Sequence, residues 1–386
     1  MAVDSGNLFP EIEGVARPAH DSGVLPCQVL DGLVAAGTIA ADGGIDPDQI
    51  QPASLDLRLG AIAYRVRASF LPGGDQPVRR KIKSLGMHEV DLSEGAVLER
   101  GCVYIVPLKE RLSLPAGLSA SASPKSSTGR LDIFTRLIAD YATVYDRVGE
   151  KYKGELFLEI SPRSFSVLVR EGARLNQIRF RRGQPPPADL DIAKLHKRDS
   201  VVFGEDAAPG TPRIDKGLWI SIDLKGVGDG GLAGYRAKRH SGLIDLARIG
   251  HYDPLEFWEP IVPSAAQDLI LNPDDFYILV SKEKISVPPD FAAEMVAYDT
   301  SVGEFRIHYA GFFDPGFGYG GEASTGTRAV LEVRSHEVPF LLEDGQVVGR
   351  LVYERLTDVP ERIYGRDIGS HYQTQELALA KQFKRG

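Results

Sequence analysis

The feature that most constrains the fold of this sequence is an internal repeat. The segment Tyr104–Pro115 recurs as Tyr277–Pro288, an offset of 277 − 104 = 173 residues. Three further matches support the register: Leu158-Glu159 with Leu331-Glu332 and Gly172 with Gly345 at the same offset, and Ser54–Arg58 with Ser221–Lys225 at 221 − 54 = 167. Matches in register at several places are hard to obtain by chance. The sequence therefore predicts two copies of one domain.

The hydrophobic pattern within each copy is typical of short β-strands. Leu55, Leu57 and Leu59 alternate with polar residues, which is the period of a half-buried strand. Further short apolar runs at 61–66, 103–108 and 156–160 are separated by glycine and proline. Helical spacing is clear only in a short segment, 24–39, so we expect a mainly β barrel or sandwich with few short helices.

Composition along the chain predicts where the domains begin and end. Residues 1–23 are rich in glycine, proline and acidic residues, which indicates an N-terminal arm. Proline and glycine cluster at both ends of 184–213, which indicates a linker. We therefore expect a first domain at 24–183, a second, degenerate copy at 214–360, and a C-terminal tail at 361–386.

Charge and cysteine content limit the classes of function. The net charge of −8 argues against general binding to nucleic acid, which requires a basic face. The two cysteines, Cys27 and Cys102, follow no metal-binding spacing and predict a disulfide-free protein of the cytosol. No segment has the length of a membrane span, and Met1–Gly23 lacks the layout of a signal peptide. We expect a cytoplasmic protein without membrane or nucleic-acid partners.

Two stretches of the first copy carry the residue types of an anion-handling site. Lys125–Arg130 (KSSTGR) offers hydroxyls, a glycine and two cations, which suit a phosphate, although such a run is also common in plain turns. Gly154–Ile160 reads as a strand on which Glu159 could serve as a general acid/base. At the equivalent of the first stretch the second copy has Asp299–Glu304, where acids replace the cations. The first copy is predicted to be catalytic and the second to be scaffold.

Several motifs resemble the deoxycytidine triphosphate deaminase family, which is related to the trimeric dUTP pyrophosphatases. Gln51–Gly60 (QPASLDLRLG) is similar to an early family motif, and Lys125–Arg130 resembles its Arg-Ser-Ser-x-x-Arg motif with lysine in first place. Gly154–Glu159 resembles the strand that ends in the family's catalytic glutamate. Ile363–Gly365 and Ser370–Gln375 resemble a C-terminal tail that closes over the triphosphate. The resemblance implies two tandem dUTPase-like barrels, of the β-clip or jelly-roll-like kind, in a long form of the family.

The resemblance also assigns roles to residues. Glu159 would be the general acid/base, Arg130 would hold it or stabilise developing charge, and Ser126 with the Ala139 main chain would orient the attacking water. Substrate contacts are expected from a larger set: Lys125, Ser127, Thr128, Gly129, Asp146, Phe157, Leu158, Gln177, Tyr364, His371, Tyr372 and Gln375. Gln177 fits a strand-capping amide equally well, and we expect Asp56 and Arg58 to form a structural pair.

The expected reaction is hydrolysis of dCTP to dUTP and ammonia, which supplies dUTP for thymidylate synthesis. Zinc deaminases carry an H-x-E…P-C-x-x-C signature, which is missing from this sequence. We therefore expect no zinc and no dedicated metal ligands, with Mg²⁺ carried in by the nucleotide. Family relatives build sites between copies around a threefold axis, so a homo-oligomer is expected, with dTTP as a candidate feedback inhibitor.

Two other functions stay open on the residues alone. A dUTP pyrophosphatase, or a bifunctional deaminase and pyrophosphatase, would need an aspartate facing the α-phosphate, and Asp146 and Asp314 are the candidates. A non-catalytic nucleotide-binding protein could use the same tandem scaffold, because a fold alone does not fix function.

Overall fold

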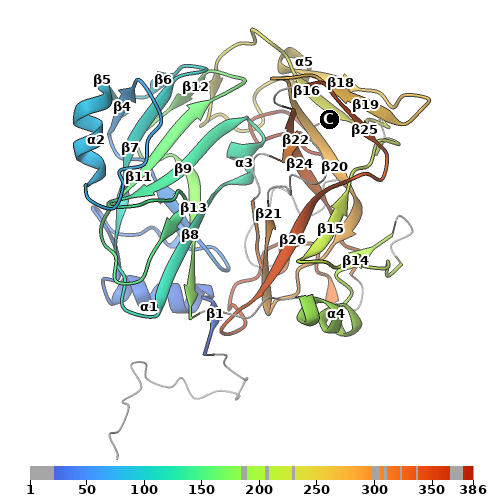
Figure 1. Cartoon of the computed structure of the whole chain (residues 1–386), viewed down its shortest axis with the longest axis horizontal. Helices are drawn as coiled ribbons and strands as arrows, with labels where there is room; N and C mark the ends of the chain where they lie inside the picture. The colour runs from blue at the N-terminus through green and yellow to red at the C-terminus, as the bar shows by residue number, and fades with distance from the viewer. Residues whose placement is uncertain are drawn as a thin grey trace, which may run out of the picture.

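In a computed structural model, the chain folds into two β domains that lie side by side (Figure 1). The structure describes residues 21–183, 189–204, 208–227, 231–296, 305–307, 311–321, 324–335, 338–365 and 377–385. Within these ranges the chain is mainly β with short helices, which confirms the predicted fold class. No helix in the described ranges is long and apolar enough to cross a membrane.

The first repeat is built from two main sheets and a small third one. Its strands are β1 Gly23–Val24, β2 Ile39–Ala41, β3 Leu55–Arg58, β4 Ile62–Val66, β5 Gly86–Asp91, β6 Ala96–Leu98, β7 Val103–Ser113, β8 Leu118–Pro124, β9 Ile133–Ala139, β10 Arg147–Val148, β11 Lys153–Pro162, β12 Val167–Val169 and β13 Arg174–Arg182. One sheet has the order β1-β13-β8-β10 with β3 beside β13, and the other has β5-β4-β7-β11-β9 with β2 beside β7.

The second repeat has the same sheet topology, which confirms the tandem arrangement. Its strands are β14 Val202–Phe203, β15 Leu218–Ser221, β16 Gly234–Ala237, β17 Ile244–Asp245, β18 Trp258–Ile261, β19 Asp268–Leu271, β20 Phe276–Ile285, β21 Phe291–Val296, β22 Phe305–Ile307, β23 Phe312–Phe313, β24 Thr327–Ser335, β25 Phe340–Glu343 and β26 Val347–Arg355. The orders β15-β26-β21-β23 and β18-β16-β20-β24-β22 reproduce those of the first repeat. Thus β11 corresponds to β24 and β13 corresponds to β26.

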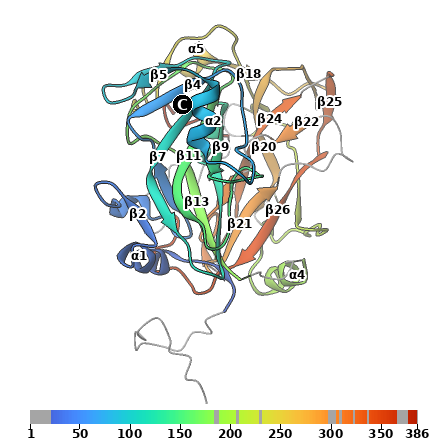
Figure 2. The ribbon, with the colours of Figure 1, turned by 60° about the vertical axis from the view of Figure 1, so that its left-hand side comes forward.

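Short helices surround the sheets. They are α1 Cys27–Ala35, the 3-10 helix η1 Pro47–Gln49, α2 Val78–Leu85, α3 Ser126–Gly129, α4 Asp189–Arg198 and α5 Pro254–Phe257. Helices α1 and α4 lie at one end of the sheets and α5 at the other, while α2 flanks the first repeat and α3 lies between the repeats (Figures 1 and 2). Helix α1 is shorter than the predicted 24–39 because Pro26 occupies its N-cap and Val24 pairs in β1. Helix α4 lies inside the predicted linker. Its Ile192 and Leu195 are buried in the core of the second repeat, so the described end of that segment belongs to the second domain.

Strand alternation decides which residues of β11 and β24 face their own core. Leu156, Leu158 and Ile160 lie in the core of the first repeat, and Leu331 and Val333 lie in that of the second. Glu159 and Glu332 therefore point out of their barrels. The outward faces of β11 and β24 contact different neighbours, and the candidate site is formed on the outward face of β24.

The end of the chain packs where the two repeats meet. Phe383 and Ala380 are buried in a hydrophobic cluster that contains residues of both repeats, and Phe383 packs edge-on against Phe257 and Trp258. Its backbone forms a bridge with Tyr252. Residues 377–385 are thus a packed element, whereas we had expected a tail that leaves the core intact when removed.

Candidate active site between the two repeats

Arg130 of the first repeat reaches across the seam to the second repeat. It forms the C-cap of α3, whose Thr128 hydroxyl is anchored by donating to the Leu175 carbonyl. The Arg130 side chain is buried, and its Nη1 donates to the Ala378 carbonyl at 3.1 Å. Its Nε lies 3.9 Å from Oε1 of Glu332. The cationic motif of one repeat therefore meets the glutamate of the other repeat and the end of the chain.

Glu332 is a buried carboxyl on the outward face of β24. Burial raises its pKa to about 8, and the positive charge of Arg130 works against that rise. A carboxyl with this pKa holds its proton at neutral pH and can donate it. The nearby Arg130 guanidinium can stabilise the carboxylate that forms when Glu332 gives up its proton.

Asp314 approaches the same seam on the glycine-rich turn after β23. Its side chain is 11% exposed, and the partial burial raises its pKa while Arg179 opposes the rise. Arg179, on β13 of the first repeat, is fully buried and donates to the Asp314 carboxylate at 3.4 Å and to the Ala293 carbonyl at 3.1 Å. The Phe312 ring lies under its guanidinium at 4.0 Å. Arg179 thus ties the turn of the second repeat to a strand of the first.

The turn around Asp314 requires glycine at position 316. Gly316 has φ of +100°, and a Cβ there would lie 2.2 Å from Ile363 Cγ2 and 2.8 Å from the Tyr364 carbonyl oxygen. Tyr364 N–H donates to the Pro315 carbonyl at 3.0 Å, and its ring packs on Phe317. The start of the predicted tail is therefore held against this turn.

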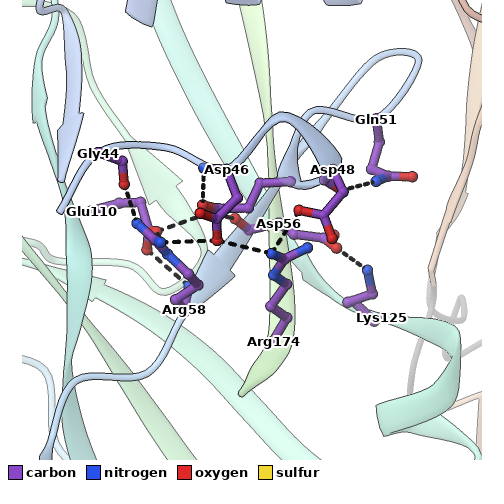
Figure 3. A network of polar contacts seen from close by, with 10 residues as sticks. Gly44, Asp46, Asp48, Gln51, Asp56, Arg58, Glu110, Lys125 and Arg174 are labelled. Carbon is purple, nitrogen blue, oxygen red and sulfur yellow. Dashed lines mark hydrogen bonds and ion pairs between the residues drawn. The ribbon is translucent and has the colours of Figure 1, made fainter. Parts of the chain in front are cut away.

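A charged network on the first repeat extends the site (Figure 3). Lys125 pairs with the buried Asp56, and Arg174 bonds to Asp46 and Asp48. Figure 3 shows Arg58 turned the other way, toward Glu110, with which it forms an ion pair at 2.9 Å. The expected Asp56–Arg58 pair is therefore wrong: the two residues share a face of β3, but Arg58 pairs with Glu110 and Asp46, and Asp56 pairs with Lys125.

Two electrostatic effects connect this network with the seam. The charges of Lys125 and Asp56, in the first repeat, both influence the pKa of Asp314, in the second repeat. These three side chains therefore lie close together. Lys381, from the packed chain end, has its pKa lowered by burial and by Lys125. The seam thus gathers Lys125, Lys381, Arg130, Asp314 and Glu332.

Glu159 occupies a different environment from the one expected. It accepts a hydrogen bond from the Ser69 hydroxyl at 2.5 Å, and burial raises its pKa while Ser69 and Arg136 lower it. The outward face of β11 is covered by the first repeat's own segment around Phe70 and α2. Of the predicted substrate contacts on this strand, Phe157 is buried against that cover and Leu158 lies in the barrel core, so neither side chain reaches the seam.

Asp146 and Ala139 also belong to the first repeat's own structure. Asp146, at φ of +58°, accepts the Leu137 N–H at 2.7 Å, and burial raises its pKa to about 7. The Ala139 carbonyl, expected to help hold a water, accepts the Ala142 N–H at 3.3 Å. The charge of Glu159 also raises the pKa of Asp146, so these two acids lie near one another.

The remaining predicted residues divide into three groups. Ser126 and Ser127 are half-buried on α3, while Thr128 and Gly129 are buried and shape that turn. Gln177 lies on β13 between Asp56 and Ser123 and accepts from Ser54 at 3.4 Å. His371, Tyr372 and Gln375 lie outside the described residues.

The sequence contained a signal for the residues that had not been assigned to the site. Each copy keeps a different half: the first has the cationic Lys125–Arg130 stretch, and the second has the glycine-rich turn that carries Asp314, followed by Glu332. Because each copy lacks the part that the other copy keeps, the pattern indicates one site shared by both. Arg179 and Lys381 gave no comparable sequence signal.

Comparisons with known proteins agree with this architecture. Residues 21–184 match the sequence model described as "2'-deoxycytidine 5'-triphosphate deaminase (DCD) N-terminal domain", and residues 188–383 match the one for the C-terminal domain. The crystal structure of 2'-deoxycytidine 5'-triphosphate deaminase from Agrobacterium tumefaciens is similar with a TM-score of 0.83 and 54% identity, over 87% of this chain and 100% of that chain.

Curated relatives are similar over a shorter stretch. A protein of Halobacterium salinarum named "dCTP deaminase, dUMP-forming" is 33% identical over 133 residues, which is 33% of this chain and 64% of that protein. A Streptomyces coelicolor protein of the same name is 29% identical over 156 residues, 38% of this chain and 77% of that protein.

The two β repeats enclose a buried carboxyl and an arginine, and deaminase family models match them along nearly their whole length. The class of protein is therefore a hydrolytic deaminase. The chain belongs to the 2'-deoxycytidine 5'-triphosphate deaminase family.

Proposed function

We propose that this chain hydrolyses the 4-amino group of dCTP in the seam between its repeats, releasing ammonia. The observation that carries the proposal is the approach of Arg130 to Glu332, 3.9 Å apart and both buried. Our expectation from sequence gave the acid/base role to Glu159. We transfer it to Glu332, because Glu332 is the carboxyl that meets the Lys125–Arg130 motif.

Glu332 would serve four proton transfers. With a pKa raised to about 8, it starts protonated and gives its proton to N3 of cytosine, which makes C4 more electrophilic. The resulting carboxylate, stabilised by Arg130, takes a proton from the attacking water, whose oxygen bonds to C4. Glu332 gives that proton to the departing amine and then takes the remaining proton of the C4 hydroxyl as the C4–N bond breaks. dCTP and water thus yield dUTP and ammonia, and Glu332 is protonated again. Ser126, one turn of α3 before Arg130, is proposed to orient the water.

Lys125 and Lys381 would receive the triphosphate. Both are cations near the buried Asp56, and the half-buried Ser127 hydroxyl lies on the adjoining turn. Mg²⁺ would enter bound to the phosphates as part of the substrate, with no dedicated ligand from the chain. Among the described residues, no group of three or more His, Cys, Asp or Glu side chains is arranged to hold a metal.

A second candidate function continues the reaction to dUMP. It is favoured by Asp314, a half-buried carboxyl whose pKa is influenced by the Lys125 charge, because hydrolysis at phosphorus needs a carboxylate beside the phosphates. The Halobacterium and Streptomyces relatives are named for forming dUMP.

One experiment separates these functions. Purified protein is incubated with dCTP and Mg²⁺, and dCTP, dUTP, dUMP and ammonia are quantified over time. Ammonia with dUTP supports deamination alone, and ammonia with dUMP supports the continued reaction. Tight dCTP binding with no ammonia would overturn the proposal in favour of a nucleotide-binding protein.

A further inference from the structure

A cavity lies on the seam, and its lining is separate from the residues assigned to the deamination site. It has a volume of about 380 Å³ and is lined by both repeats. Its lining residues are Arg100, Gly101, Arg163, Ser164, Ala237, Lys238, Arg239, Asp274, Asp275, Phe276 and Arg334. None of the residues proposed above to handle dCTP is among them.

The wall from the first repeat consists of two adjoining turns. Gly101 N–H donates to the Pro162 carbonyl at 2.8 Å, which fixes the turn that carries Arg100 beside the one that carries Arg163. Arg163 N–H in turn donates to the Asp132 carbonyl at 2.9 Å. Both arginine side chains are exposed at the cavity, and their backbones are held in place.

Arg334 closes the cavity between the repeats. It lies on β24 two residues after Glu332 and therefore on the same outward face. Its guanidinium pairs with the carboxylate of Asp132 and donates to the Asp274 carbonyl. The Arg334–Asp132 pair thus forms the floor of the cavity.

The lining carries an excess of positive charge. It has five cationic side chains and two carboxylates. Asp275 is already matched by Arg239 at 2.9 Å, and Arg334 by Asp132. This leaves Arg100, Arg163 and Lys238 with Asp274 as the remaining carboxylate of the lining, and Lys238 Nζ donates to the Leu255 carbonyl at 2.6 Å. None of these three cations forms an ion pair with another residue in the described part of the chain.

We infer that this cavity binds a phosphate-bearing anion. Guanidinium groups match phosphate oxygens in paired hydrogen bonds, and gathering three uncompensated cations is unfavourable unless an anion joins them. The volume suits a small molecule with one or two phosphates. On a protein of net charge −8, such a concentration of positive charge is a local feature of the seam.

The test is equilibrium binding by calorimetry in Mg²⁺-free buffer, with inorganic pyrophosphate and adenosine diphosphate as separate probes. The protein is compared with the double variant Arg100→Ala/Arg163→Ala. The control is Arg80→Ala/Lys83→Ala, which removes the same charge from exposed positions of α2. Thermal melting confirms that all three proteins are folded.

We expect one binding step of the wild type to weaken at least tenfold in the Arg100/Arg163 variant and to persist in the control. Loss for both probes identifies phosphate as the recognised group, and loss for the nucleotide alone means that the nucleoside contributes. Equal binding by the two double variants, or binding by none of the proteins, would overturn the inference. Turnover of dCTP does not enter the readout, so the result stands apart from the proposed deamination.

Discussion

Nε of Arg130 lies 3.9 Å from Oε1 of Glu332, although the two residues are 332 − 130 = 202 positions apart in the chain. Each belongs to a different repeat, and each is buried. The equivalent carboxyl of the first repeat, Glu159, is covered by its own repeat through Ser69. One tandem chain therefore joins complementary halves of its two copies at a single seam.

Replacing Glu332 by glutamine should abolish deamination while dCTP binding persists. The amide keeps the shape of the side chain but cannot carry the proton between water, N3 and the amine. Loss of a general acid/base costs on the order of 10²–10⁴-fold in rate. The measurement is kcat for ammonia release together with calorimetric binding of dCTP.

Glu159→Gln is the matched control for that variant, because Glu159 is the same residue at the equivalent position. We expect it to retain most of the activity. If Glu159→Gln were inactive and Glu332→Gln active, the acid/base role would return to the first repeat.

The stability of the protein should depend on pH through Glu332. The pKa is about 8 in the folded chain against an ordinary value of 4.5, so the folded state keeps a proton that the unfolded state releases between these limits. This contribution is therefore fully present below the lower limit and is lost as pH rises through the upper one. Relative to Glu332→Gln, which does not titrate, the wild-type Tm should fall from about pH 5 to about pH 8. A Tm difference that is constant over this range would contradict the raised pKa.

Arg179→Met should destabilise the association of the two repeats. The variant leaves Asp314 without the guanidinium that opposes its rise in pKa, and removing one partner of a buried pair costs about 3–5 kcal/mol. Urea unfolding measures the loss. Arg179→Met/Asp314→Asn should recover part of it, and no recovery would mean that Arg179 acts through its carbonyl contacts alone.

Phe383→Ala should lower stability by about 3–5 kcal/mol, the usual cost of emptying a buried aromatic site. Phe383 packs with Phe257 and Trp258 near the end of the chain. Denaturant unfolding checks the effect, with the exposed Leu255→Ala as control. Unchanged stability would show that the chain end is not part of the core in solution.

Turnover should require Mg²⁺ and resist zinc-specific chelators, because the triphosphate brings its own cation and the sequence lacks the H-x-E…P-C-x-x-C signature of zinc deaminases. Initial rates with EDTA, with EDTA followed by excess Mg²⁺, and with a zinc chelator test this. Stoichiometric zinc whose removal stops the reaction would refute it.

The repeat and the strand period were sufficient to predict the fold. A shift of 173 residues aligns β7 with β20 and β11 with β24, and alternation correctly placed Leu156 and Leu158 on one face. The linker was less predictable. The polar sequence around α4 hides two residues, Ile192 and Leu195, whose burial depends on contacts with the second core.

The site was predicted in its parts but not in its assembly. Local pattern singled out the Lys125–Arg130 motif and Glu159, whereas Glu332 was noted only as the repeat match of Glu159 in a copy predicted to be scaffold. Which glutamate meets Arg130 depends on how the two barrels dock, and strand periodicity carries no information about docking. Arg179 shows the same limit, since its partner Asp314 lies 314 − 179 = 135 residues away.

Because both halves of the seam belong to one chain, dilution of the protein should not separate them. When complementary halves sit on separate chains, the fraction of assembled sites falls as the protein concentration drops. Here Arg130 and Glu332 share one polypeptide, so each half meets the other at a fixed effective concentration set by the intervening chain. Occupancy of the seam should be as complete at nanomolar as at micromolar protein, and a cell could keep this activity with very few copies of the chain.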